Sequence, residues 1–389
     1  MQGHNPSALE TTTAVLGTAV VSLVTTPLVP ALPALAASFA GGTLDANLIA
    51  QMLMAAPAVM VILGGPLSAL LLKVCSIRTA LLGLVSLFAV AGSAGLVLDS
   101  LALLFASRLL IGLCAGAVST LSLALIATRY EEGVRNRLFG WTSACGSFLG
   151  MGGLLLGGLL VEALGARGPF LLYLATTVLL AMVFATRKEG TPPAGRRTQP
   201  LSDLRPLLST YLLLLMAAAG LFFLHAKGPF LLTRVEIASA SSIGLVLSLA
   251  AVISAVSAAL FAPLLRWIGV PHLLRLTFLM LGCGVALAAL ASSPVLLLSG
   301  FVLLSIGGGI VAPLFKTIIL GKAAAAVQAL AAGLILSSLY VAQFMVPLVI
   351  HGLEEIVGQG AALWMFAGAL ALLGVGVRGR RKGFGWRAS

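Results

Sequence analysis

Three ionisable side chains lie inside long apolar stretches of the 389-residue chain, where a charge needs a partner. Arg108 stands about eight residues into the apolar run 100–127, and His225 and Lys227 stand near the end of the run 207–232. A charge at the centre of a helix in lipid costs ~2.5–3.5 kcal/mol, so such residues normally face other protein or a water-filled cavity. An arginine or lysine there can hold an anionic group, and a histidine can exchange a proton near neutral pH.

Each of the three side chains also has a structural interpretation, which stays open at this point. Arg108 can bond to backbone carbonyls of the first helix, which the prolines of range 27–33 would release. Lys227 can extend its stem toward the membrane surface, and His225 can be a hydrogen-bonded packing residue. Positions 225 and 227 differ by about 200° around a helix, so at most one of them faces a given cavity.

The elements that position these residues are twelve apolar runs. Hydrophobic residues make up 60% of the chain and charged residues only 9%, against roughly 25% charged in soluble domains. A bilayer core about 30 Å thick takes ~20 apolar residues to cross as a helix. The runs are 11–34, 47–72, 79–98, 100–127, 137–163, 168–186, 207–232, 240–265, 271–291, 294–319, 325–351 and 360–377. We therefore expect an all-α membrane protein with 12 transmembrane helices.

The distribution of basic residues predicts the orientation. The chain holds 23 Lys and Arg residues, and most of them fall in alternate breaks between the runs, while only Arg167 and Arg234 fall in the other breaks. Cytoplasmic loops carry this excess of positive charge. We expect a multi-pass protein of the bacterial inner membrane with both termini in the cytoplasm, in contact with membrane lipids. The net charge of +12 thus reflects topology, and we expect no nucleic-acid partner.

A polar segment divides the runs into two sets of six. The segment 187–206 contains adjacent prolines and five basic residues, which indicates a cytoplasmic linker. We expect an N-terminal six-helix bundle over 1–186, a C-terminal six-helix bundle over 207–377 and a basic tail over 378–389. Short strings recur in the two halves at nearly constant offset, so we expect the bundles to be pseudo-symmetric. Two such units can rock about a site between them.

Several motifs occur at the joints between the runs. Gly65-Pro66-Leu67-Ser68 ends the second run, and in the other half a corresponding stretch keeps a basic residue at Arg266. In the fourth run Leu104, Arg108 and Gly112 are spaced by four. The fifth run carries a glycine motif at Gly153, Gly157 and Gly158.

These motifs resemble those of the major facilitator superfamily (MFS) across essentially the whole chain, and the glycine motif resembles that of bacterial drug and metabolite efflux members. The resemblance implies the MFS fold and secondary active transport by alternating access. The motifs are degenerate: Ala69 stands where the family has an acid, Ile111 where it has a glutamine, and the proline of the glycine motif is absent. The glycines also have a simpler interpretation as close helix packing.

The remaining candidate site residues are uncharged. We place none of the eleven acids at a helix centre, so Coulomb attraction favours an anionic, zwitterionic or neutral organic substrate. The candidates for substrate binding or coupling beside Arg108, His225 and Lys227 are Thr25, Thr26, Phe222, Phe223, Tyr340 and Gln343. The glycine motif favours proton-coupled export, as in an antiporter. The alternatives are proton-coupled or facilitated uptake of an organic anion, and a transporter-like sensor that moves no solute.

Other classes of function lack the residues they need. The chain has no H-E-x-x-H, no G-x-S-x-G and no phosphate-binding G-x-x-x-x-G-K-[ST] motif, so we expect no enzyme and no ATP-driven pump. Its four cysteines show no paired spacing, which argues against disulfides and a metal site. We expect a monomer without cofactor, whose partners are a small-molecule substrate and a proton or other coupling ion.

Overall fold

The computed structural model of the protein describes residues 7–41, 45–186, 206–323 and 327–376. The described residues form helices joined by short turns, and twelve of the helical segments are long and apolar enough to cross a membrane. The all-α fold class predicted from the runs is therefore confirmed. The tail 378–389 and the predicted linker 187–206, apart from its last residue, lie outside the described ranges.

The first six spans are made of eleven helical elements, because three of the spans consist of more than one element. They are α1 (Ala8–Ala19), η1 (Val20–Leu23), η2 (Thr26–Leu28), α2 (Leu32–Ser38), α3 (Ala46–Leu71), α4 (Ile77–Ser93), η3 (Ala94–Leu96), α5 (Leu101–Arg129), α6 (Glu132–Leu164), η4 (Gly168–Ala175) and α7 (Thr176–Ala185), where η marks a 3₁₀ helix. The last six spans are α8 (Leu208–Arg234), α9 (Ala240–Ala259), α10 (Phe261–Leu290), α11 (Pro294–Lys322), α12 (Gln328–Val357) and α13 (Gln359–Gly376).

Polar side chains start the helices where the apolar runs begin. Ser7 accepts a bond from the backbone N–H of Glu10, and the Glu10 carboxylate accepts one from the N–H of Ser7, which makes a capping box. The Asp45 carboxylate accepts from the N–H of Leu48 at 2.9 Å and so caps α3. Such caps satisfy the N–H groups that the first turn leaves unpaired.

Most span boundaries lie within a few residues of the predicted runs. The first span ends at Leu28 and not at residue 34, α12 ends at Val357 and not at residue 351, and the eighth and ninth spans meet at a different place. The eighth run was expected to continue to residue 265, but α9 ends at Ala259 and α10 begins at Phe261. Pro263 is the third residue of α10, where a missing N–H costs no helical bond. Gly269 then takes a left-handed conformation with φ 73°, which bends α10 near its start.

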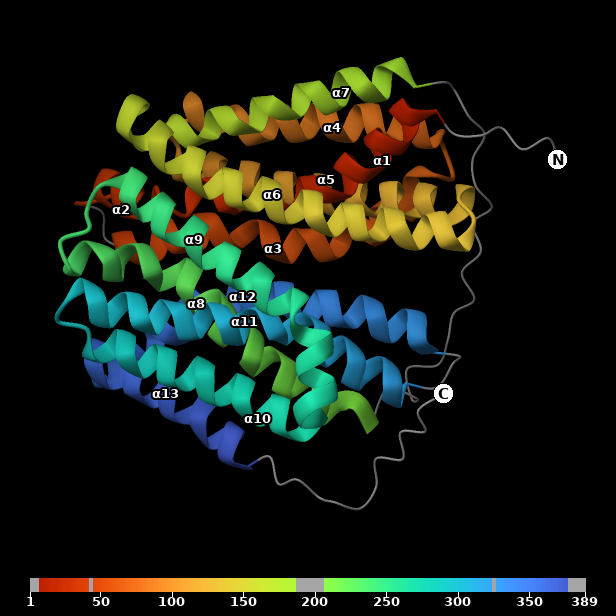
Figure 1. Ribbon diagram of the computed structural model, residues 1–389. Coiled ribbons are helices and arrows are strands. Elements are labelled where there is room, and N and C mark those ends of the chain that lie inside the picture. Colours follow the sequence, from red (N-terminus) through yellow and green to blue (C-terminus); the bar gives the residue numbers. More distant parts are fainter. Residues whose placement is uncertain (1–6, 42–44, 187–205, 324–326, 377–389) are drawn as a thin grey trace. The chain divides into compact units, whose positions relative to one another are not determined.

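The chain divides into two compact units. The first comprises residues 1–199, 225–251 and 343–348, and the second comprises 200–224, 252–342 and 349–389. In the first unit α3 packs along α5, and α4 lies beside α7 (Figure 1). In the second unit α10 packs against α11 and α13. The division of the chain into six-helix bundles over 1–186 and 207–377 stays a prediction from the sequence.

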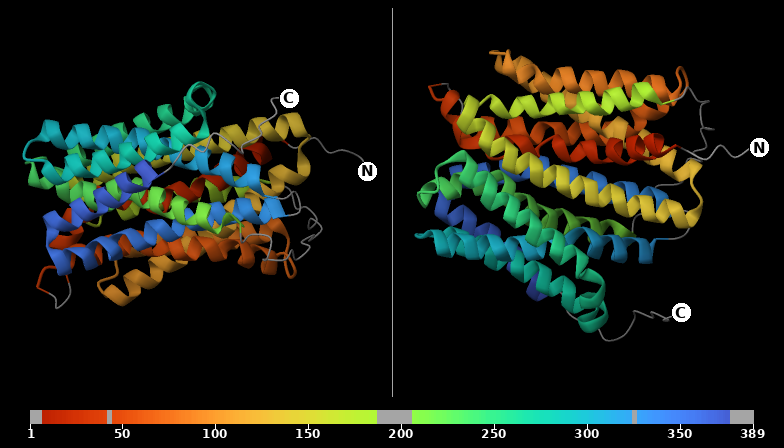
Figure 2. Two further views of the ribbon diagram at one scale, coloured as in Figure 1. Left: turned by 90° about the horizontal axis from the view of Figure 1, so that it is seen from below. Right: turned by 45° about the horizontal axis from the view of Figure 1, so that its top comes forward.

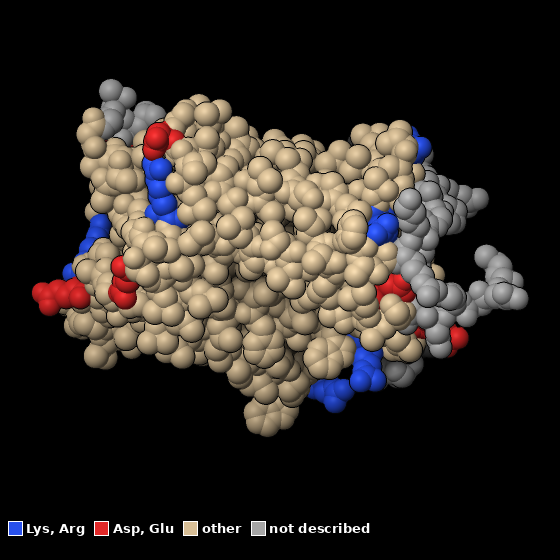
Figure 3. Space-filling view, turned by 90° about the horizontal axis from the view of Figure 1, so that it is seen from above, with Lys and Arg blue, Asp and Glu red and all other residues tan. Residues whose placement is uncertain are grey.

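Charged side chains gather near the helix ends. On the face shown in Figure 3, Lys, Arg, Asp and Glu lie toward the two ends of the helices, and the surface between them is uncharged. The acids among the described residues lie in loops, at caps or in the terminal turns of helices. This pattern is what a bilayer requires, because a charge at its centre is expensive.

Candidate functional site

The first span is broken in its middle. Between Ala19 and Leu32 the chain forms only the short helices η1 and η2 with turns between them. Prolines in this stretch remove backbone donors, as the sequence indicated, so some carbonyls lose their helical partners. Side chains bond to two of the carbonyls: Thr26 Oγ1 donates to Ser22 O at 2.7 Å, and the Tyr173 hydroxyl donates to Val24 O at 2.9 Å. Non-helical backbone at membrane depth occurs where protein or a cavity satisfies it.

Two predicted site residues meet at this break. The Gln343 side-chain amide of α12 donates to Thr25 Oγ1 at 3.3 Å, and both residues belong to the first unit. Gln343 is 6% exposed, whereas Thr25 is half-buried. The contact joins a hydroxyl and an amide, each with hydrogen-bonding capacity left over. The arrangement is a neutral polar site beside a broken helix.

Glycines of α6 let that helix lie against the break. A Cβ at Gly153 would press on the Thr26 side chain, and a Cβ at Gly157 would collide with the Pro27 carbonyl. Small residues at such positions allow backbones to approach closely inside a membrane, where packing replaces the hydrophobic effect. The glycines of the predicted motif therefore allow α6 to pack directly against the polar break.

Gly158 faces a different partner. A Cβ there would collide with the backbone of Ala240 at the start of α9, a segment that belongs to the same unit. Ser248 Oγ of α9 donates to Met151 O of α6 at 3.2 Å, further along the same contact. At its end the Glu162 carboxylate accepts from Ser241 N at 3.2 Å and Ser241 Oγ at 2.7 Å. A side chain of α6 thus caps the N-terminus of α9.

Arg108 is fully buried in α5. Its Nη2 donates to the carbonyl oxygens of Ala91 at 3.0 Å and Gly92 at 2.8 Å, in the last turn of α4. Its guanidinium lies 4.9 Å from the ring centroids of both Phe170 and Tyr173. The structural interpretation from the sequence expected carbonyls of the first helix, and this was wrong in the partner: the carbonyls belong to α4.

The groups that Arg108 contacts are all neutral in the described structure. A helix ends with carbonyls that lack donors and with the negative pole of its dipole, so a cation is favourable there. Contact with two aromatic faces adds roughly 2 kcal/mol or more when the site is free of water. The arrangement explains how a charge is held in this span without a carboxylate.

The other candidates from the sequence lie on α8 and α12. Phe223 is fully buried in the second unit, with its ring centroid 5.9 Å from that of Phe366. Phe222, His225 and Lys227 are half-buried on α8, and each makes further interactions. Tyr340 is half-buried on α12. The hydrogen bond between Thr25 and Gln343, with Thr26 next to Thr25 in the chain, makes a local polar cluster of three candidates.

A model of the Major Facilitator Superfamily matches residues 14–347 of the sequence. The chain belongs to the major facilitator superfamily. It is thus a secondary transporter of small solutes by family, and not an enzyme. No curated protein sequence matches the chain significantly.

Solved structures of other transporters share the fold. The nucleoside transporter NupG superposes with TM-score 0.78 at 11% identity, covering 95% of this chain and 98% of the other. A D-xylose-proton symporter gives TM-score 0.74 at 14% identity, covering 94% and 96%. A peptide transporter, POT, in complex with sulfate gives TM-score 0.72 at 18% identity, covering 94% and 92%. At such identities the likeness establishes the fold alone.

The superfamily motif after the second span lies in the last turns of α3. Ser68 is buried and donates to Gly65 O at 2.6 Å, whereas Pro66 is exposed and Leu67 is half-buried. A Cβ at Gly65 would meet only the Thr120 hydroxyl at ordinary contact distance. In the second unit, Arg266 is exposed on α10.

Glycines of this superfamily member also allow close contact between α3 and α5. A Cβ at Gly112 would collide with the Pro57 carbonyl, and one at Gly116 with the Val61 carbonyl. Gly64, one position before the predicted motif glycine, meets the backbone of α5 at Gly116. The sequence analysis named Gly112 but missed Gly64 and Gly116. The available signal was the spacing of four residues between Gly112 and Gly116.

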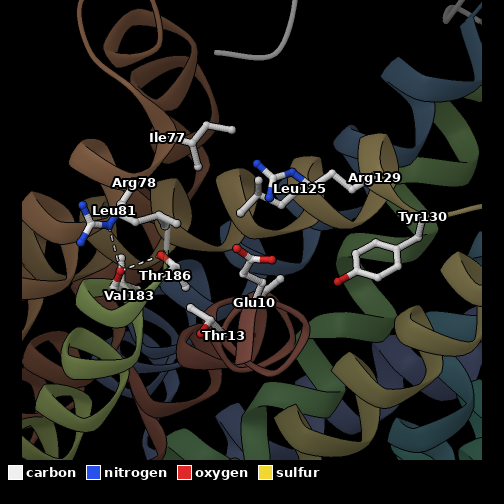
Figure 4. A pocket seen from close by; sticks show the side chains of 11 residues that line it. Glu10, Thr13, Ile77, Arg78, Leu81, Leu125, Arg129, Tyr130, Val183 and Thr186 are labelled. Atoms are coloured by element: carbon white, nitrogen blue, oxygen red, sulfur yellow. Dashed lines mark hydrogen bonds between the residues drawn. The ribbon is translucent and has the colours of Figure 1, made fainter. Parts of the chain in front are cut away.

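A pocket opens at one end of the first unit, among the ends of α1, α4, α5 and α7 (Figure 4). Arg78 donates through Nε to Val183 O at 3.3 Å and through Nη2 to Phe184 O, so it holds the end of α7. Glu10 and Arg129 also line the pocket. In Figure 4 the Glu10 carboxylate points into the pocket between the two arginines, so the chain itself supplies an anion there. None of these residues is among the site candidates from the sequence.

Among the described residues, no group of three or more His, Cys, Asp or Glu side chains is arranged to hold a metal ion.

Proposed function

We propose that this superfamily member moves a small anionic, zwitterionic or neutral organic solute by alternating access. The observation that carries the proposal is the polar cluster at the broken first span, where Thr25 and Gln343 present a hydroxyl and an amide without a carboxylate. Discontinuous helices form substrate sites in secondary transporters, because their free backbone groups and neighbouring polar side chains face the solute. A neutral cluster suits a solute that is recognised by hydrogen bonds.

The charges of the spans support the same substrate class. The described acids stand at helix ends, and the buried cation Arg108 is held by neutral groups. A lipophilic cation gains little in such surroundings, because a buried positive charge needs a compensating negative one. An anion or a zwitterion gains from the basic side chains of α5 and α8.

For direction and energy source we propose proton-coupled export across the bacterial inner membrane. The support is the close approach of α6 at Gly153, Gly157 and Gly158, the motif that resembles that of exporters. The missing proline of that motif keeps uptake of an organic anion as the second candidate. A sensor that binds without transport is the third. We propose that the transporter works as a monomer with both termini in the cytoplasm.

A two-stage experiment tests this function. Purified protein is first screened by thermal shift against matched anionic, zwitterionic, neutral and cationic compounds, and we expect stabilisation by members of the first three classes. Stabilisation by cations alone would overturn the substrate class. Flux of a stabilising compound into proteoliposomes, with and without a proton gradient, then separates a transporter from a sensor, which binds but shows no flux.

Variants at the cluster link the binding to the site. Thr25→Val and Gln343→Leu each remove one hydrogen-bonding group, so we expect ligand affinity to fall about five- to tenfold, the equivalent of roughly 1 kcal/mol. The control is Thr128→Val, at an exposed threonine near the end of α5 whose hydroxyl bonds to Ala124 O. If Thr25→Val and Gln343→Leu bind the ligand with the same affinity as Thr128→Val, the ligand site lies elsewhere.

A further inference from the structure

The start of α10 forms a short helix that runs across the rest of the element. Residues 261–268 precede Gly269, whose left-handed conformation bends the chain. In Figure 1 these first turns of α10 run across the direction of the long helices, and in the left view of Figure 2 they are seen end-on. The element therefore changes direction by a large angle at a single residue.

The length of α10 beyond the bend places the short helix at the membrane surface. From Val270 to Leu290 the element has about 20 residues, which at 1.5 Å each match a hydrocarbon core about 30 Å thick. The bend must then lie at one boundary of that core. A helix that runs across the bundle at this depth lies in the headgroup region of one leaflet.

Side chains around the bend combine an aromatic ring with basic groups. Trp267 is 90% exposed, and Arg266 beside it is exposed as well. Tryptophan is enriched at membrane–water interfaces, because its ring is apolar and its N–H is polar. Each arginine near an anionic surface adds about 1 kcal/mol of attraction.

A shallow groove, open to the surface and lined by α10 alone, lies at the bend. Its lining consists of Trp267, Ile268, His272, Arg275, Leu276 and Leu279. His272 is anchored by its Nδ1, which lies 3.1 Å from Ile268 O across the bend. The lining combines two polar groups, His272 and Arg275, with apolar side chains on both sides of the bend, and it contains no carboxylate among the described residues.

We propose that this groove binds one anionic phospholipid. Arg266 lies at the surface before the bend, and Arg275 extends its side chain toward the headgroup from one to two turns along the span. Trp267 covers the glycerol region, and an acyl chain runs along Leu276 and Leu279. The two arginines and the apolar side chains thus match the two parts of the lipid. A free phosphate would use only the basic end and would leave the apolar part of the groove exposed.

Trp267 provides the readout for the test. The protein is reconstituted in nanodiscs that contain a minor fraction of brominated phosphatidylglycerol or brominated phosphatidylcholine, and quenching of the Trp267 fluorescence is taken as the difference between wild type and Trp267→Phe. We expect the anionic lipid to occupy the groove with about fivefold preference over the zwitterionic lipid. Equal quenching by the two headgroups overturns the proposal.

Two further arms define the ligand. The double variant Arg266→Gln/Arg275→Gln should lose most of the preference, and retained preference would overturn the basic site. Inorganic phosphate at millimolar concentration should leave the quenching unchanged, whereas competition would show a site for free anions. The matched control is Trp141→Phe, which removes a tryptophan that is 55% exposed near the start of α6 and should leave the headgroup preference intact. The readout does not involve solute flux, so its failure would leave the proposed transport untouched.

Discussion

At the scale of single residues, Arg108 shows how a charge is kept in an apolar span. The guanidinium binds the carbonyls at the end of α4 and lies against two aromatic rings, and it is 0% exposed. Substrate binding and structural support were equal alternatives from the sequence. The geometry shows that Arg108 joins α5 to α4 and to the aromatic rings of η4, so any role in substrate binding comes in addition to this structural role.

Replacing Arg108 should therefore affect stability as well as transport. Arg108→Ala leaves two carbonyls without a charged donor and opens a cavity, so we expect a loss of roughly 2–3 kcal/mol or more in stability. Arg108→Lys keeps the charge but not the planar stacking, and its loss should be smaller. Thermal unfolding of the purified variants measures the effect, and flux in proteoliposomes is measured in parallel. Unchanged thermal stability together with lost flux would show a purely functional arginine.

At the scale of helices, glycines decide which elements come closest. Gly112 and Gly116 of α5 lie against the backbone of α3, and Gly158 of α6 lies against that of α9. The sequence shows where glycines occur but not which face of the helix they occupy. From the sequence, close packing was one of two interpretations of the α6 glycines, which were treated as one surface. The structure divides their contacts between the first span and α9.

Gly112→Ala tests the close approach of α3 and α5. The added methyl group would collide with the Pro57 carbonyl, and because backbone cannot move aside like a flexible side chain, we expect a loss of about 1–3 kcal/mol. The matched control is Gly83→Ala on α4, where the methyl group meets open space and helix propensity improves. Thermal unfolding of both variants gives the comparison. Equal stability of the two would show that α3 and α5 are not in tight contact.

At the scale of the whole molecule, the charged breaks predict which loops face the cytoplasm. Val74, in the break before α4, is 81% exposed. Asp99, in the break before α5, has a side chain that is 87% exposed. In a cysteine-free background, Val74→Cys should react with a membrane-impermeant maleimide only after the cells are permeabilised. Asp99→Cys should react in intact cells, and its lost pair with Arg167 is exposed and costs at most about 1 kcal/mol. The reverse labelling pattern would invert the topology.

Much of the architecture could be predicted because membrane crossing imposes a length. Runs of about 20 apolar residues leave few choices, so the twelve spans and most of their ends matched. The bend at Gly269 was missed because Phe261–Ile268 has the same apolar composition as a span. The partners of Arg108 were missed because tertiary packing, and not local sequence, brings α4 and η4 to it. Thr25 and Gln343 were named separately, and only the fold shows their contact.

The surroundings of Arg108 also have an order in time. Ala91 and Gly92 leave the ribosome before Arg108, so the growing chain offers the guanidinium its acceptors as soon as α5 enters the bilayer. Phe170 and Tyr173 are synthesised only with the sixth span. The hairpin of α4 and α5 can thus satisfy the charge of Arg108 with its own carbonyls during membrane insertion, before the later spans are made. A nascent chain stalled before Gly168 would still lack the aromatic cover of that charge.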